Sequence, residues 1–520
     1  MQDIYYKYQL DYRERRSITV GVEGLEVWFI TGSQELYGKE VLKKVESNSK
    51  KLVEYLNDQA GLPVKIVWKP VLKESQQIRT LMNEANGNDR CIGLMAWMHT
   101  FSPGKMWIAG LKALRKPFLH FHTQFDQKIP WKSIDMDYMN TNQSAHGGRE
   151  FGFTATRLDI RRKVIAGHWK NPEMIARVEN WIRAALGWNE MQNLKVARLG
   201  DNMRDVAVTE GNKVDAQIDL GYEVHGYAMG DFIKLVKKVK ESEIEALVKQ
   251  YGQEYPLTRS SVSQEEFKSS LHEAAKIEIA LRRFLDMGPF KAFTTTFQDL
   301  YGLRQLPGLA VQRLMRDGYG FGGEGDWKTA ALVRTMKVMA AGRDRGTSFV
   351  EDYIYHFEPG NMKELGSHML EVCESLADGP ISLEVHPLSI GDKEAPARSV
   401  FDSREGEAVQ VCIVEFGDRF RMIVNEVEVV KRRQEEEMPG LPVARVLWIP
   451  KPDLPTAATA WILAGGAHHS CLSYTVNTEQ LEDLCEMLDI EFVVIDRDTK
   501  IRDFKRELRN GEIYYKLRKL

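Results

Sequence analysis

The stretch LEVWFITGSQELYGKEVLKK, Leu25 to Lys44, places an apolar run before a polar loop and a helical pattern. LEVWFITGS has the character of a buried strand, and KEVLKKVESNSKKLVEYLND has the period of an amphipathic helix. The alternation continues with the strands PVKIVWKPV, CIGLMAWM and PFLHFHT and the helices SQQIRTLMNEANG and PGKMWIAGLKALRK. This alternation predicts a parallel sheet covered by helices, which is a doubly wound α/β fold.

The loops at the carboxyl ends of these strands are the first candidates for a binding site, because open α/β sheets bind ligands there. They read GSQELYG (Gly32 to Gly38), MHTFSPGK (Met98 to Lys105) and HTQF (His122 to Phe125). All three are rich in polar and aromatic side chains, so we expect them to form a wall of a substrate site.

The rest of the chain predicts two further domains. After the helix NPEMIARVENWIRAALGW, the strand LKVARLGDN begins a second α/β region that ends with PFKAFTTTF and the helix LPGLAVQRLMRDG. Strand patterns with short turns follow (TSFVEDYIYHF, VQVCIVEF, RFRMIVNEVEVV), and the helix TEQLEDLCEML and the strand EFVVID close the chain. We therefore predict an extension at residues 1–24, two Rossmann-like α/β domains at 25–193 and 194–343, and a mostly antiparallel β-rich domain at 344–520.

Composition excludes several classes of protein. The net charge is only -3, with acids and bases interspersed, whereas a nucleic-acid or anionic-membrane binder usually carries a basic face. Five scattered cysteines without a CxxC pair fit a reducing compartment. The tyrosines and charges of the first residues do not fit a signal peptide, and no apolar run reaches the ~20 residues of a membrane span. We expect a cytoplasmic protein with no nucleic-acid or membrane partner.

The glycine-rich segment YGFGGEGDW, Tyr319 to Trp327, has two readings. A dinucleotide-binding loop is disfavoured, because the segment follows a predicted helix and no acid stands about 20 residues on at a strand end. The favoured reading is a tight turn that points Glu324 into a cavity, and a solvated loop glutamate is the alternative.

A predicted hairpin brings a carboxylate and an imidazole together. EPGN is a turn signal. In an antiparallel hairpin the residue numbers of two opposed positions add up to a constant, and a turn centred near Pro359 and Gly360 makes this sum close to 719. Glu351 and His368 satisfy this sum, and directly opposed side chains share a face with Cβ atoms roughly 4.5 to 5.5 Å apart. Such a pair can clamp a divalent ion or form a cross-strand ion pair.

Other histidines are less decisive. His120 and His122 share a strand face, where hydrogen-bonded histidines are a simpler reading than a metal pair. In WILAGGAHHS a strand-like apolar run precedes two glycines and two histidines. Adjacent side chains point apart on a strand or helix, so only one of His468 and His469 should face a given ion, and spacing cannot say which.

The chain resembles the L-arabinose isomerase family along nearly its whole length. The matching stretches include TGSQELYG, WMHTFSPGKMWI, DMDYMNTNQSAHGGREFGF, GDNMRDVAVTEGNKVDAQ, LPGLAVQRLMRDGYGFGGEGDWKTAAL, GTSFVEDYIYHFE, GSHMLEVC and PDLPTAATAWILAGGAHH, in order. The resemblance implies one divalent ion, typically Mn²⁺, held by Glu324, Glu351, His368 and His469. Carboxylate and imidazole ligands with open positions suit such an ion better than structural zinc.

The resemblance also implies the chemistry: conversion of L-arabinose to L-ribulose, with D-galactose to D-tagatose as a side reaction. Glu324 and Glu351 would move protons between C1 and C2. The implied sugar contacts are Gln34, Leu36, Tyr37, Phe101, Gln143, His146, Met203 and Phe297. A homohexamer of two trimers is expected, in which first-domain loops reach the site of a neighbouring subunit.

Two departures and three alternatives accompany this reading. TFQDL places Gln298 where TFEDL is expected, and the extension at residues 1–24 has no counterpart. The alternatives are an isomerase tuned to another aldose, a non-catalytic sugar-binding protein and a metallohydrolase. A non-catalytic sugar-binding protein would be expected to lack one of the ion ligands, and a metallohydrolase would need a separate residue to activate water. The sequence shows neither feature.

Overall fold

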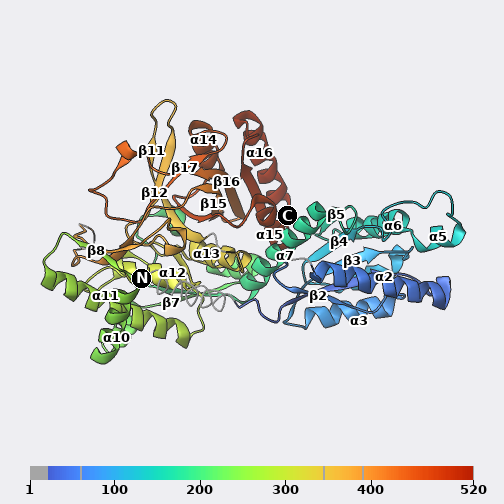
Figure 1. Ribbon diagram of the computed structural model, residues 1–520, viewed down its shortest axis with the longest axis horizontal. Coiled ribbons are helices and arrows are strands. Elements are labelled where there is room, and N and C mark those ends of the chain that lie inside the picture. The colour runs from blue at the N-terminus through green and yellow to red at the C-terminus, as the bar shows by residue number, and fades with distance from the viewer. Residues whose placement is uncertain (1–20, 59–60, 344–345, 389, 391, 519–520) are drawn as a thin grey trace. The chain divides into compact units, whose positions relative to one another are not determined.

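A computed structural model describes residues 21–58, 61–343, 346–388, 390 and 392–518 (Figure 1). The chain forms two compact units. The first, here called the small unit, contains Gly21–Asn189 and Glu479–Asp489. The second, the large unit, contains Glu190–Thr478 and residues 490–518. Most of the extension predicted at residues 1–24, residues 1–20, lies outside the described residues.

The small unit is built on a five-stranded parallel sheet with the order β2-β1-β3-β4-β5. Its strands are β1 (Glu26–Gly32), β2 (Lys65–Trp68), β3 (Cys91–Met98), β4 (Phe118–His122) and β5 (Lys163–Ala166). The chain adds β2 on one side of β1 and then adds β3, β4 and β5 on the other side. The switch point of the topology therefore lies between β1 and β3, and the loops after these two strands border the crevice where doubly wound folds bind ligands. The predicted parallel α/β fold is confirmed.

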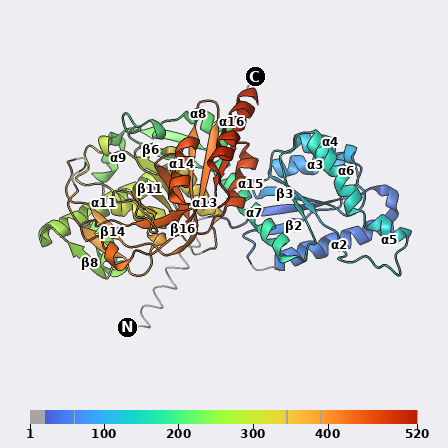
Figure 2. The same cartoon turned by 90° about the horizontal axis from the view of Figure 1, so that it is seen from above.

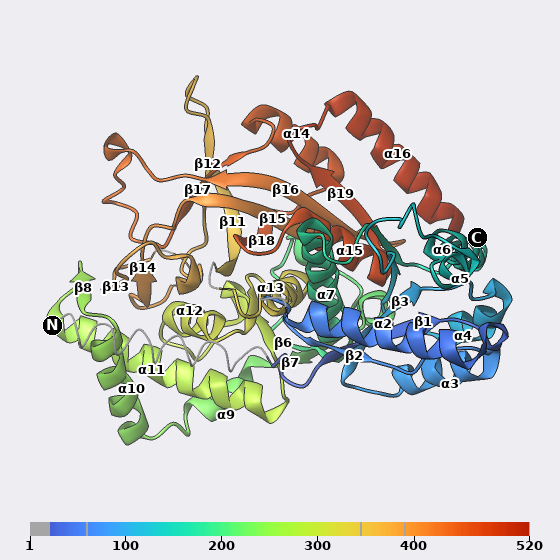
Figure 3. The same cartoon turned by 45° about the vertical axis from the view of Figure 1, so that its right-hand side comes forward.

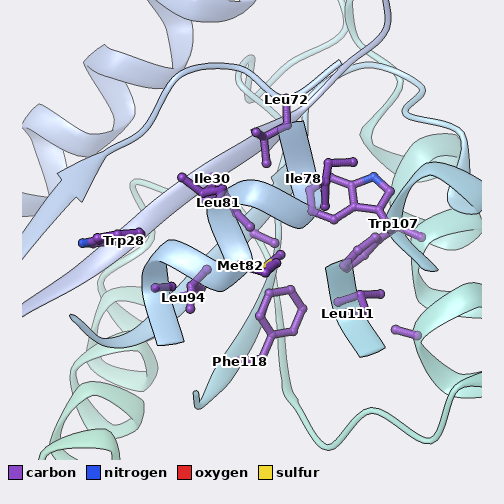
Figure 4. Close-up of a cluster of buried hydrophobic side chains, with 14 of the residues drawn as sticks. Trp28, Ile30, Leu72, Ile78, Leu81, Met82, Leu94, Trp107, Leu111 and Phe118 are labelled. Carbon is purple, nitrogen blue, oxygen red and sulfur yellow. The ribbon is translucent and has the colours of Figure 1, made fainter. Parts of the chain in front are cut away.

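Helices cover both faces of this sheet (Figure 2). The helices of this unit are α2 (Gly38–Asp58), α3 (Ser75–Asn86), α4 (Ile108–Ala113), α5 (Met136–Thr141), α6 (Ser144–Arg157), α7 (Pro172–Asn193) and α15 (Thr478–Leu488). On one face, α3, α4 and α6 pack on β1 and β3 through a cluster that includes Trp28, Met82, Trp107 and Phe118 (Figure 4). The central strands β1, β3 and β4 are buried along nearly their whole length, as expected of a parallel sheet covered on both faces, whereas the outer strands β2 and β5 are partly exposed.

Helix α15 belongs to the small unit although it follows strands of the large unit. Glu479 and Asp483 of this helix accept hydrogen bonds from Nζ of Lys163 at 2.7 Å each. Glu479 also accepts from Nε of Arg177 at 2.9 Å. A segment predicted to close the β-rich domain is thus held by the first sheet.

The large unit begins with a second parallel sheet, in the order β10-β9-β6-β7. Its strands are β6 (Lys195–Leu199), β7 (Glu223–Tyr227), β9 (Ala292–Thr295) and β10 (Gly320–Gly322). The helices of this region are α8 (Lys213–Asp215), α9 (Met229–Val236), α10 (Glu241–Glu254), α11 (Gln264–Met287), α12 (Gly308–Arg316) and α13 (Trp327–Met339). Every residue of α13 is buried, because this helix packs between the parallel sheet and the following strands.

The remaining strands form a mostly antiparallel sheet in the order β15-β18-β11-β12-β17-β16-β19, and β15 also pairs with β16. Its strands are β11 (Thr347–His356), β12 (Lys363–Ser367), β15 (Gly406–Glu415), β16 (Phe420–Val429), β17 (Val446–Pro450), β18 (His469–Ser473) and β19 (Glu491–Ile495). Six of these strands therefore close into a ring. A smaller sheet joins β8 (Leu257–Ser260), β13 (Ser382–Val385) and β14 (Ala397–Val400).

Helices α14 (Leu454–Ala464) and α16 (Ile501–Arg518) pack beside β16 and β19 (Figure 3). Two sequence-based expectations fail here. The apolar run before GGAHHS is helical rather than strand-like, because Asp453 caps the helix start and Gly465 ends it in the left-handed conformation. The strand EFVVID is also not the last element, since α16 follows it. The described residues contain no helix long and apolar enough to cross a membrane.

Candidate functional site

The glycine-rich segment forms a tight turn that exposes Glu324 to a cluster of histidines. As expected, the segment follows a helix, α12, and it contains the three-residue strand β10 before α13 begins. Glu324 itself has a φ of 59° and Gly325 a φ of 82°, so both lie in the left-handed region. A Cβ atom at Gly323 would come within 2.9 Å of Nε2 of His368, so this position admits only glycine without a shift. Backbone strain at a non-glycine residue is typical of functional sites.

His368 and His469 are buried and each directs its Nδ1 toward a carboxylate. Nδ1 of His469 donates to Oδ2 of Asp326 at 3.2 Å, and Nδ1 of His368 donates to Oε2 of Glu371. In each ring the proton is thereby held on Nδ1, and Nε2 keeps a free lone pair. Asp326 and Glu371 were not found from the sequence, although each stands two or three residues from a predicted ligand.

The two Nε2 atoms face the predicted glutamates. Nε2 of His469 is 3.9 Å from Oε2 of Glu324, and Nε2 of His368 is 3.8 Å from Oε2 of Glu351. The two rings meet edge to face with centroids 5.9 Å apart. The structure therefore brings the four predicted ligands together in two carboxylate–imidazole pairs.

The predicted strand register of Glu351 is wrong by one residue. Near the turn the expected sum of 719 holds, since Tyr355 pairs with Glu364. A β-bulge between Asp352 and Ile354 then shifts the register, so Glu351 pairs with Ser367. A bulge inserts an extra residue into one strand, which number sums cannot anticipate. On its other side Glu351 pairs with His469 of β18.

His468 is also a member of this cluster. Its Nε2 lies 3.6 Å from Oε2 of Glu324, and a group of ligand atoms from Glu324, His468 and His469 lies within 4.8 Å. His468 is half-buried, whereas His469 is fully buried. Both histidines thus approach one carboxylate, because His468 lies just before the start of β18 rather than within the strand.

The predicted sugar contacts of the large unit lie beside this cluster. The ring of Phe297 stacks on His368 with a centroid separation of 5.8 Å. The backbone N–H of Met203 donates to the carbonyl of Glu324 at 2.9 Å. Oε1 of Gln298 accepts from the backbone N–H of Arg204 at 2.9 Å, so this glutamine holds the loop that carries Met203.

Electrostatics at the cluster favour charged carboxylates. Burial by itself raises the pKa of Glu324, but the nearby imidazoles of His468, His469 and His368 outweigh it and lower the pKa. For Asp326 burial likewise raises the pKa, yet Lys328 and His469 lower it to about 2. Burial lowers the pKa of His368, but the Glu371 carboxylate outweighs burial and raises it.

This donor set fits a divalent ion. Nε2 of His469 is buried, and no described residue forms a hydrogen bond with it. Separations of 3.6 to 3.9 Å between ligand atoms exceed hydrogen-bond length. They are consistent with atoms that share one ion, because oxygen ligands of hard divalent ions lie about 2.0 to 2.6 Å from it. An imidazole nitrogen buried without a partner is otherwise costly.

The other predicted sugar contacts belong to the small unit, at the carboxyl edge of its sheet. Oη of Tyr37 donates to Oε1 of Gln143 at 2.8 Å. The ring of Phe101 stacks on His146 at a centroid distance of 4.5 Å. Gln34 is half-buried at the start of a short 3-10 helix, and Leu36 in that helix is 84% exposed. Four of the six residues are therefore paired, and they come from the loops after β1 and β3 and from α6 and its amino-terminal flank.

Two doubly wound sheets, a ring of antiparallel strands and a carboxylate–imidazole cluster define a multidomain α/β enzyme. Comparisons with known proteins narrow this class. The models of the L-arabinose isomerase N-terminal, central and C-terminal domains match residues 21–193, 195–342 and 346–491. The chain belongs to the L-arabinose isomerase family, and it is an isomerase.

Individual relatives cover almost the entire chain. L-arabinose isomerase of Geobacillus stearothermophilus is 55% identical over 94% of this chain and 98% of its own length. L-arabinose isomerase of Herpetosiphon aurantiacus is 54% identical over 95% of this chain and 98% of its own. That of Flavobacterium johnsoniae is 55% identical over 96% and 99%.

Proposed function

We propose that this chain converts L-arabinose to L-ribulose with the help of a divalent ion, Mn²⁺ in the first instance, and D-galactose to D-tagatose more slowly. The observation that carries the proposal is the buried Nε2 of His469, which lies beside the carboxylate of Glu324 and has no hydrogen-bond partner among the residues that the structure describes. Glu324, Glu351, His368 and His469 would hold the ion. When bound, the ion would act as a Lewis acid on the sugar oxygens, worth several kcal/mol.

The carboxylates would carry the proton transfers. An aldose becomes a ketose when a proton leaves C2 and one arrives at C1, while a hydroxyl proton shifts to the former carbonyl oxygen. Glu324 and Glu351 would act on either side of a cis-enediol, and general acid–base catalysis of this kind contributes about 10² to 10⁴ in rate. His368 and His469 would keep their positions through Glu371 and Asp326.

We further propose a cytoplasmic homo-oligomer, a hexamer, in which small-unit loops complete the site of another subunit. Exposed apolar side chains of the small unit support this arrangement: Leu36 at 84%, Trp131 at 79% and Met136 at 65%. Large apolar side chains in such number on one unit are typical of covered surfaces. All five cysteines are buried, and none of them forms a disulfide with another described residue, as suits a reducing compartment.

The direct experiment measures ketose formation by chelator-treated protein with and without added Mn²⁺. We expect L-arabinose to be converted only with the ion, and at a higher kcat/KM than D-galactose or any other aldopentose or deoxyhexose of a panel. Glu324→Gln and Glu351→Gln should each lower kcat at least about a hundredfold while the circular dichroism spectrum stays unchanged. Near-normal turnover by either variant, or a better substrate in the panel, would contradict the proposal.

A further inference from the structure

A cavity of about 250 Å³ lies in the small unit at the edge of the sheet opposite to the loops of Tyr37 and Phe101. Its lining includes Phe118 and Lys163, which are the first residues of β4 and β5. Helices α7 and α15 contribute further walls, through Trp188 and Met487 among others. None of the predicted sugar or ion contacts lines it.

The described residues that line this cavity include more cations than carboxylates. Five cations line it, namely Arg115, Lys116, Arg161, Arg162 and Lys163, against the three carboxylates of Asp159, Asp483 and Glu486. Lys163 neutralises Asp483 at 2.7 Å, and Arg161 contacts Glu486 at 3.4 Å. Three cations therefore face the cavity with one carboxylate left among them.

Arg162 is held in place without a counterion among the described residues. Its Nη1 donates to the carbonyl of Ile160 at 3.1 Å, and its Nη2 donates to the carbonyl of Gly152 at 3.1 Å and to Oγ1 of Thr156 at 2.8 Å. Its Nε is buried and has no hydrogen-bond partner in the described part of the chain. Burial lowers the pKa of this guanidinium. A half-buried cation fixed by neutral acceptors is a costly arrangement that an anion would relieve.

The cavity also presents apolar and aromatic surface. Its floor includes Leu111 and Phe118, which come from the core cluster of the small unit (Figure 4). The indole of Trp188 forms one side, with Nζ of Lys116 at 5.8 Å from its ring centroid. An indole next to cations suits a ligand that joins an anionic group to a ring.

We propose that this cavity binds a small organic phosphate monoester. The phosphate contacts Arg115, Lys116 and Arg162, and the sugar or base ring of the ester lies against Trp188. Guanidinium groups are preferred partners of phosphate because their N–H groups match its oxygens in pairs. The volume, just below the roughly 300 to 1,000 Å³ of sites for drug-sized ligands, limits the ligand to about a sugar phosphate or a nucleoside monophosphate.

The test is isothermal titration calorimetry on the full chain with D-ribose 5-phosphate, adenosine monophosphate, D-ribose, adenosine and inorganic phosphate. We expect saturable binding of at least one ester and weaker binding of the matching unphosphorylated compound. The ester that binds tells whether a sugar or a base lies on Trp188. The absence of saturable binding up to about 10 mM of either ester would overturn the proposal, and so would inorganic phosphate binding as tightly as the esters.

Paired variants locate the binding. Arg115→Gln with Lys116→Gln removes two cavity charges, one from an exposed and one from a half-buried position, so the fold should persist. Lys65→Gln with Lys112→Gln removes two charges from exposed positions outside the cavity. We expect the ester Kd to rise about ten- to a hundredfold in the first variant and less than about threefold in the second. Equal weakening in both would show non-specific attraction and overturn the site.

Discussion

At the scale of single residues, the candidate ion site depends on which ring nitrogen of each histidine donates a hydrogen bond and which one faces the carboxylates. Nδ1 of His469 and of His368 is committed to a carboxylate, so the second nitrogen of each ring can face the cluster only as an acceptor. His468 has no such partner for Nδ1 among the described hydrogen bonds and is half-buried. The two adjacent histidines are therefore chemically different.

This difference predicts unequal effects of two neighbouring substitutions. His469→Ala removes a proposed ligand of the ion. It should therefore weaken Mn²⁺ binding by more than about 100-fold, since the loss of a residue that only hydrogen-bonds to a ligand typically costs about 10- to 100-fold. His468→Ala should retain bound ion and alter mainly the KM for sugar. Calorimetric titration of chelator-treated protein with Mn²⁺ gives both affinities, and the opposite ranking would mean that the wrong histidine has been assigned.

Asp326 should act through His469 rather than on the sugar. Asp326→Asn keeps the shape but loses the charge that fixes Nδ1–H, so we expect Mn²⁺ affinity to fall about 10- to 100-fold. Because the side chain also caps α13 through the backbone N–H of Thr329, the asparagine should preserve the helix start. Unchanged Mn²⁺ affinity with an unchanged melting temperature would exclude a positioning role.

At the scale of elements, helix α15 shows how few contacts decide where a segment belongs. The nearly buried Lys163 holds both Glu479 and Asp483, whereas Arg177, which is 41% exposed, forms an ion pair with only Glu479 among the described residues. The two acids respond differently: burial raises the pKa of both, but for Glu479 the three donors outweigh burial and lower it to about 2, while Asp483 reaches about 6. Burial therefore has the larger effect on the pKa of Asp483, and the ion pair with Lys163 offsets part of the cost of burying this carboxylate.

Removing Lys163 should consequently destabilise the small unit strongly. Lys163→Met leaves a buried carboxylate without its partner, a change that costs about 3 to 5 kcal/mol. Arg177→Gln breaks a more exposed pair with the same Glu479 and should cost under about 1 kcal/mol. Urea unfolding of both variants measures the free energies of unfolding, and similar losses would show that Lys163 does not anchor α15.

At the scale of the whole molecule, buried ion pairs tie the helices of the large unit together. Arg313 of α12 contacts Glu254 of α10 and Glu278 of α11, and Arg316 contacts Glu254 at 3.0 Å. Burial by itself raises the pKa of Glu254, but the two guanidinium groups outweigh it and lower the pKa to about 2. The folded state therefore holds this carboxylate charged more tightly than the unfolded state does.

This shift predicts a loss of stability in acid. The contribution of Glu254 is fully present above its ordinary pKa near 4.5 and disappears as pH falls from there toward 2, because the unfolded chain takes up the proton first. The loss should be on the order of 2 to 3 kcal/mol. Glu254→Gln should show a flatter free energy of unfolding between pH 5 and pH 3 in urea titrations, and an unchanged slope would contradict it.

The sequence by itself determined the parallel α/β fold, the antiparallel strands and the family. Local periodicity indicates which face of an element is buried, and short motifs such as GGEGDW and GSHML can be recognised directly in the amino-acid sequence. It also named Glu324, Glu351, His368 and His469, which the structure brings together in pairs. It misjudged WILAGG, because a helix with an apolar sequence on all sides lacks the period that distinguishes it from a strand.

Only the tertiary structure decided the contacts between distant segments. A bulge in β11 moves Glu351 opposite Ser367 and His469, and no local pattern encodes that extra residue. Asp326 and Glu371 gain their roles from the orientation of two imidazoles, and α15 joins the small unit through Lys163, more than 300 positions away in sequence. Such contacts depend on packing across the whole chain, whereas periodicity records only the burial of each element on its own.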